Sequence, residues 1–75
     1  MPKLKKISGE EAIRALVRLG FIRIRQRGSH VILKKQTNVE YIGCVVPLHK
    51  ELKIGTLLGI LKQAKIDPED FSKLL

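Results

Sequence analysis

The sequence predicts a small α+β domain with the element order α-β-β-β-α, in which helices cover one face of a three-stranded antiparallel sheet. Two observations lead to this prediction. Apolar residues recur at helical spacing near both ends of the chain, whereas the middle holds three runs rich in Val and Ile that are separated by turn residues. A three-stranded meander cannot bury its apolar side alone, so we expect the helices to pack on that side.

The first helix is predicted over Gly9–Leu19. Ser8 followed three residues later by Glu11 is a capping-box pattern, which marks a helix start. Gly20 stands where a helix commonly ends in a left-handed residue. The apolar residues at helical spacing are Ala12, Ile13, Leu16, Val17 and Leu19.

A hairpin and a third strand are predicted next. The hairpin strands cover Phe21–Gln26 and His30–Lys35, and Gly28 supplies the unusual dihedral angles of the turn between them. After a polar connector, a third strand covers Glu40–Pro47. Pro47 ends this strand because proline cannot donate a hydrogen bond to a sheet ladder.

Two more helices complete the predicted order. A charged loop, Leu48–Lys53, precedes a helix from about Thr56, its expected N-cap, to Lys65. Asp67 as N-cap and Pro68 at the first helical position predict a short last helix. The expected buried stripe of the longer helix is Leu57, Leu58, Ile60, Leu61 and Ala64, and the last helix carries Phe71, Leu74 and Leu75.

Length and composition indicate one domain over residues 1–75. With only three aromatic residues, its core is expected to consist of Leu, Ile and Val. A single cysteine, Cys44, excludes an intramolecular disulfide and suits a reducing cytoplasm, and its apolar neighbours favour a buried, inert thiol. No apolar stretch reaches the length of a membrane span, so we expect a cytoplasmic protein with no membrane partner.

The chain is strongly basic, with fifteen Lys and Arg against seven Asp and Glu, a net charge of +8. Between Ala12 and Val39 there are seven basic residues and no acidic residue. Such a distribution favours a polyanion or an acidic protein as partner. A solvated basic surface that serves only solubility is the alternative.

His30 is the candidate catalytic residue, because it is one of two histidines and follows the basic turn of the hairpin. An imidazole transfers protons near neutral pH, so it can take the proton of a ribose 2′-hydroxyl that attacks the adjacent phosphate. The expected RNA-binding residues around it are Arg23, Arg25, Arg27, Gly28 and Ser29. The alternative is a surface histidine without a role.

The other polar residues give weaker signals. We interpret His49 as a loop residue, although a second acid–base group or a phosphate donor is possible at this position. Lys50 and Lys53 flank His49 and are expected to extend the track that binds the phosphate backbone, unless they are simply solvated. The spacing of His, Cys and acidic residues matches no metal site, and no cofactor motif is present, so we expect neither metal nor cofactor.

Five segments carry a resemblance to a known family: Leu19–Phe21, Arg25–His30, Val46–His49, Glu51–Leu57 and Ile60–Ala64. They resemble the HicA family of small mRNA interferase toxins from type II toxin–antitoxin systems. The resemblance implies a fold like that of double-stranded-RNA-binding domains, endoribonuclease activity on messenger RNA, His30 as the catalytic residue and a HicB-like antitoxin that masks the site. A non-catalytic RNA-binding module with the same basic face is the alternative function, and the oligomeric state is left open.

Overall fold

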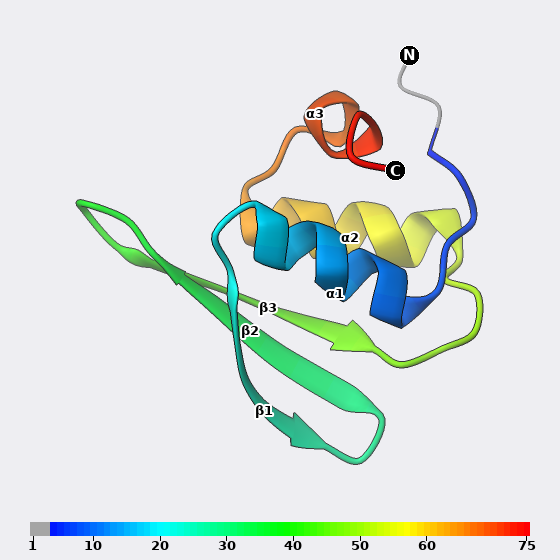
Figure 1. The fold of residues 1–75 in the computed structure, drawn as a ribbon, viewed down its shortest axis with the longest axis horizontal. Coiled ribbons are helices and arrows are strands. Elements are labelled where there is room, and N and C mark those ends of the chain that lie inside the picture. Colours follow the sequence, from blue (N-terminus) through cyan, green and yellow to red (C-terminus); the bar gives the residue numbers. More distant parts are fainter. Residues whose placement is uncertain (1–3) are drawn as a thin grey trace.

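A computed structural model, which describes residues 4–75, confirms the predicted α-β-β-β-α order and the short additional helix (Figure 1). The three strands form one antiparallel sheet in the order β1-β2-β3. The fold therefore has the predicted α+β class and the arrangement of a double-stranded-RNA-binding domain. The elements are α1 (Gly9–Arg18), β1 (Ile22–Arg27), β2 (His30–Gln36), β3 (Tyr41–Pro47), α2 (Ile54–Ala64) and α3 (Pro68–Ser72).

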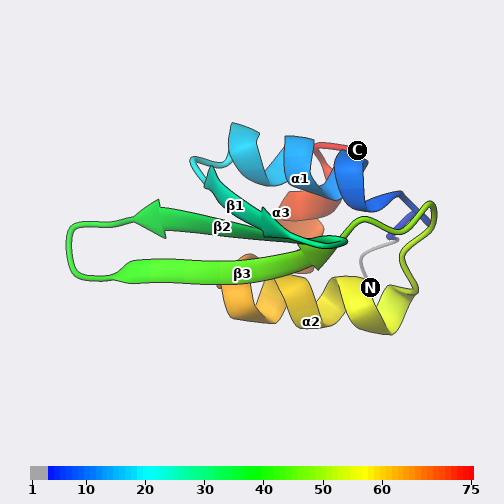
Figure 2. The same cartoon turned by 90° about the horizontal axis from the view of Figure 1, so that it is seen from below.

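All three helices lie on the same side of the sheet. Figure 1 shows them above the strands, and Figure 2 shows the strands in front of α3, between α1 and α2. The hairpin formed by β2 and β3 extends beyond the helices in both views. We call the uncovered side of the sheet the open face. Its cross-strand rows are Arg27–His30–Pro47, Arg25–Ile32–Val45, Ile22–Lys34–Gly43 and Gln36–Tyr41.

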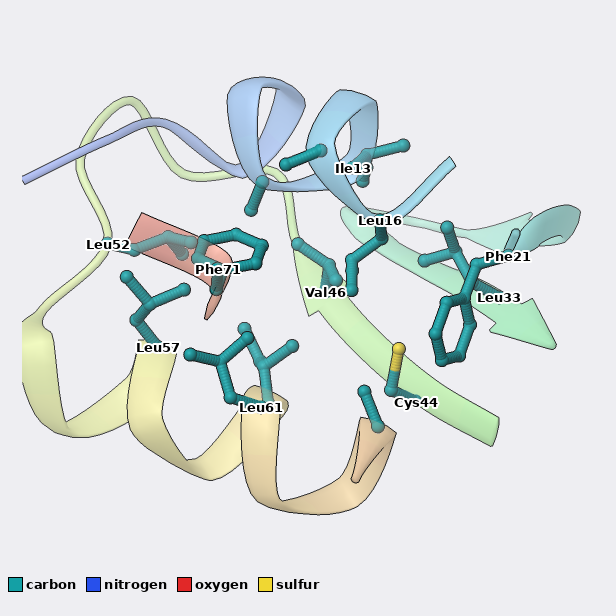
Figure 3. Close-up of a cluster of buried hydrophobic side chains, with 14 of the residues drawn as sticks. Ile13, Leu16, Phe21, Leu33, Cys44, Val46, Leu52, Leu57, Leu61 and Phe71 are labelled. Atoms are coloured by element: carbon teal, nitrogen blue, oxygen red, sulfur yellow. The ribbon is translucent and has the colours of Figure 1, made fainter. Parts of the chain in front are cut away.

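The core lies between the sheet and the helices (Figure 3). Leu, Ile and Val make up most of it, as predicted, but Phe21 and Phe71 are buried as well. The Phe71 side chain packs in the core between α1 and α2, and this contact holds the short helix α3 against the rest of the molecule. The fully buried large side chains are Phe71, Leu16, Leu33, Leu52, Leu57, Leu61, Val31 and Val46.

The two ends of α1 follow their sequence signals. The Ser8 hydroxyl accepts from the Glu11 amide, and the Glu11 carboxylate accepts from the Ser8 amide, both at 3.1 Å. The bond from the Ser8 amide to the carboxylate lowers the pKa of Glu11, because it favours the charged form. At the other end Gly20 has a φ of 99°, and the Phe21 amide donates to the Leu16 carbonyl. This reversal leads the chain directly into β1.

The predicted start of α2 is wrong. The helix begins at Ile54, its N-cap is Lys53 rather than Thr56, and no side chain caps it. Leu52, immediately before it, is fully buried and its amide donates to the Ile7 carbonyl at 2.7 Å. Packing therefore fixes where the helix starts, because tertiary contacts contribute more to helical stability than local signals do.

Two residues of the predicted helix stripes are exposed rather than buried. Leu58 of α2 is 41% exposed and Val17 of α1 is 48% exposed. Each follows a buried residue directly, and one residue is about 100° of rotation in an α-helix. Both side chains therefore point past the edge of the core-facing stripe.

Candidate functional site

The turn between β1 and β2 presents His30. Gly28 has a φ of 59°, and a Cβ built there meets no atom within 4 Å, so the turn needs glycine for its dihedral angle and not for space. The Gln26 side-chain amide donates to the Gly28 carbonyl at 2.9 Å, and this hydrogen bond stabilises the turn. His30 follows as the first residue of β2.

His30 lies on the open face and is exposed to solvent. The next residue, Val31, is fully buried, and adjacent strand residues point to opposite faces. His30 pairs with Arg27 on one side and Pro47 on the other. Directly opposed residues on one face have Cβ atoms about 5 Å apart, so the Arg27 side chain starts beside that of His30 and its guanidinium can reach a phosphate bound at the imidazole.

The register of β1 separates the three candidate arginines. Arg25 pairs with Ile32 and lies on the same face as Arg27 and His30. A bulge between Arg23 and Arg25 places Arg23 opposite the buried Leu33 instead. The structure thus brings Arg25 and Arg27 together with His30 and puts Arg23 on the other face.

Arg23 is engaged on the helix side of the sheet. Its guanidinium donates to the Glu10 carboxylate of α1 at 3.3 Å and to the Gln26 side chain at 3.1 Å. An exposed ion pair of this kind contributes little stability, but it holds Arg23 away from the open face. A regular strand without a bulge would place all three arginines on one face. No feature of the sequence indicates the bulge, so this difference could not be predicted.

The loop after β3 begins beside the same turn. The Leu48 amide donates to the Ser29 carbonyl at 2.6 Å, and the His49 carbonyl accepts from the Gly9 amide at 2.9 Å. Ser29 therefore ties this loop to the turn through its backbone. Lys50, Lys53 and the side chain of His49 are exposed in this loop.

The electrostatic character of the open face is one-sided. Within the described residues, none of its paired positions carries a carboxylate, whereas Arg25, Arg27 and Lys34 carry positive charge. Such a surface attracts polyanions and raises their local concentration.

Cys44 plays no part in this site. Its side chain is 3% exposed on the helix-covered face, and burial raises the pKa of its thiol to about 11. A neutral, buried thiol is a poor nucleophile and a poor metal ligand at neutral pH. The prediction of a buried thiol is therefore confirmed.

Within residues 4–75, no group of three or more His, Cys, Asp or Glu side chains is arranged so that it could hold a metal ion. The helices of the same residues lack the length and apolar character that crossing a membrane requires.

Comparison with known families places the chain. Residues 9–66 match the model of a family described as the HicA toxin of bacterial toxin–antitoxin systems. The matched segment runs from α1 past the end of α2 and includes the turn that presents His30. No curated protein matches the chain. Since the family model covers most of its length, the chain belongs to the HicA toxin family.

Proposed function

We propose that this toxin is a metal-independent endoribonuclease that cleaves messenger RNA in the cytoplasm, with His30 as its general acid–base. The observation that carries the proposal is the pairing of an exposed histidine with Arg27 on an open sheet face whose paired positions, within residues 4–75, carry no carboxylate. Membership of a toxin family supports it, because destruction of messenger RNA stops growth.

In the proposed reaction, His30 removes the proton of a ribose 2′-hydroxyl. The 2′-oxygen then forms a bond to the adjacent phosphorus, and the bond to the 5′-oxygen breaks. This leaving oxygen takes up a proton from water, and protonated His30 returns its own proton to the solvent. The products are a 2′,3′-cyclic phosphate and a 5′-hydroxyl. General acid–base catalysis of this type contributes roughly 10²- to 10⁴-fold to the rate.

Arg27 and Arg25 have a second task. The pentacoordinate phosphorus carries more negative charge than the starting diester, and fixed cations stabilise it more strongly than they stabilise the substrate. The turn residues Gly28 and Ser29 let the RNA backbone approach, and Lys50 and Lys53 bind phosphates further along the chain.

The same cations provide the basis for inhibition. We propose that a HicB-like antitoxin with an acidic surface docks on the arginines and covers His30. Complementary charge makes such capture fast, and no change of the toxin fold is needed.

His30→Ala and His49→Ala test the catalytic assignment side by side. Both residues are exposed, so both variants should fold, which circular dichroism checks. We expect His30→Ala to lose RNA cleavage and growth arrest, and His49→Ala to keep most of both. Undiminished cleavage by folded His30→Ala would overturn the assignment. Wild-type protein that retards RNA in a gel without producing new 5′ ends would instead indicate a non-catalytic RNA-binding module.

A further inference from the structure

We propose that the open face is a binding track for single-stranded RNA, along which a base stacks on Tyr41 over the bare backbone of Gly43. The inference rests on the proposed ribonuclease function and adds a binding site for the nucleotides away from the cleaved bond. It places the two ends of the track at His30 and Tyr41, at opposite ends of the β2–β3 pairing.

Tyr41 is an aromatic side chain without a place in the core. The other two aromatic residues, Phe21 and Phe71, are buried, whereas Tyr41 is 70% exposed on the open face. Tyr41 is the first residue of β3, next to the connection from β2, and the β2–β3 hairpin extends beyond the helices (Figure 2). Exposed aromatic rings on a sheet are the platforms on which unpaired bases stack.

Gly43 leaves a gap on the same face. It pairs with Lys34 and lies two residues from Tyr41, so the two positions are neighbours on one face. A Cβ built at Gly43 would meet the Leu33 carbonyl oxygen at 3.8 Å and the Lys34 Cγ at 3.9 Å, which are ordinary contacts. Among the described glycines, only Gly20 and Gly28 have a positive φ. The backbone of Gly43 therefore has a conformation that other residues also adopt.

The fold therefore does not require glycine at position 43. Glycine inside a strand weakens the strand, and it often marks a place where a ligand comes close to the backbone. A flat base seated beside the Tyr41 ring is such a ligand.

Charge and length favour RNA as the occupant. Lys34 stands between the two ends, Arg25 and Arg27 stand near His30, and the face carries no carboxylate among its paired positions. The six residue steps from Tyr41 to Pro47 span about 20 Å. This length accommodates roughly four nucleotides, the lower limit of site sizes in single-strand binding domains.

RNA binding by four variants tests the track. A fluorescent 2′-O-methyl RNA of about ten nucleotides, which the proposed 2′-hydroxyl chemistry cannot cleave, is titrated with protein, and the same sequence as a duplex serves for comparison. We expect Tyr41→Ala to weaken single-strand binding at least about fivefold, and Tyr41→Phe to retain it because phenylalanine keeps the stacking ring. Val39→Ala is the matched control, since Val39 is 87% exposed in the same hairpin without an aromatic ring. It should bind as the wild type does.

Gly43→Val provides a test that misfolding cannot imitate. Valine favours strands, so the melting temperature should stay the same or rise while single-strand binding falls. Wild-type affinity in both Tyr41→Ala and Gly43→Val would overturn the track, as would equally tight binding of the duplex. If Gly43→Val keeps its RNA affinity but no longer binds the antitoxin, the Tyr41 end of the face binds protein and not RNA, and the proposal is wrong.

The binding assay separates this proposal from the catalytic one. Cleavage by His30→Ala together with weak binding by Tyr41→Ala would refute the proposed chemistry and leave the track standing. Loss of cleavage in His30→Ala together with unchanged binding by Tyr41→Ala would refute the track alone.

Discussion

One bulge in β1 determines which arginines share a face with His30. The sequence places Arg23, Arg25 and Arg27 at alternate positions, and alternation alone predicts one shared face. The bulge turns Arg23 toward Glu10 on the helix side instead. The position of His30 could be predicted, because Gly28 and the flanking apolar runs are local signals. The division of the arginines could not, because it depends on how β1 pairs with β2.

The salt dependence of RNA binding tests whether Arg25 and Arg27, but not Arg23, contact the RNA. Replacing Arg25 and Arg27 by Gln should weaken RNA binding and flatten its dependence on salt, because each lost phosphate contact removes about 0.7 from the log–log slope for a single strand. Arg23→Gln is the matched control and should leave the slope unchanged, since its guanidinium is held by Glu10. Equal effects of all three substitutions would contradict the separation of the two faces.

At the scale of elements, local signals and packing contribute differently to each helix. The start of α1 could be predicted because Ser8 and Glu11 satisfy exposed backbone amides locally. The start of α2 could not, because the burial of Leu52 determines it and Thr56 offers only a misleading polar side chain. The close contact between α1 and β3 at Gly9 cannot be predicted from the rules for helix starts and ends. A Cβ at Gly9 would overlap the Pro47 carbonyl oxygen, so α1 approaches the end of β3 closely.

Two glycine-to-alanine substitutions in helices should therefore have opposite effects. Gly9→Ala should destabilise the protein by about 1–3 kcal/mol, because the backbone of β3 must move. Gly59→Ala in α2 should stabilise it by about 1 kcal/mol, because alanine is the better helix former and no atom lies within 4 Å of the added Cβ. Denaturant unfolding measures both free energies. A stabilising Gly9→Ala would show that α1 and β3 do not meet as described.

At the scale of the whole molecule, the candidate site residues and the buried thiol lie on opposite faces of one sheet. His30 and two arginines lie on the open face, whereas Cys44 lies under the helices. The core and the helix-covered face could be predicted from apolar periodicity, since that pattern repeats over several elements. The free space at Gly43 could not, because it requires the register of β2 and β3.

Alkaline pH should lower stability through Cys44. Folding raises the pKa of its thiol from 9.0 to about 11, so the unfolded chain releases this proton first as the pH rises. The folded state binds more protons in that window, and the free energy of unfolding therefore falls between the two values. Unfolding curves from about pH 8 to about pH 10 should decline more steeply for the wild type than for Cys44→Val. Parallel curves would show that the thiol is not buried.

The chemistry of the RNA ends tests the central claim most directly. Wild-type protein incubated with RNA in excess EDTA should produce 2′,3′-cyclic phosphate and 5′-hydroxyl ends, because the ribose 2′-oxygen is the nucleophile and His30 moves its proton. A 3′-hydroxyl product would contradict the account, because it indicates that a metal-activated water attacked the phosphate. Loss of cleavage in EDTA with recovery on addition of Mg²⁺ or Mn²⁺ would contradict it equally.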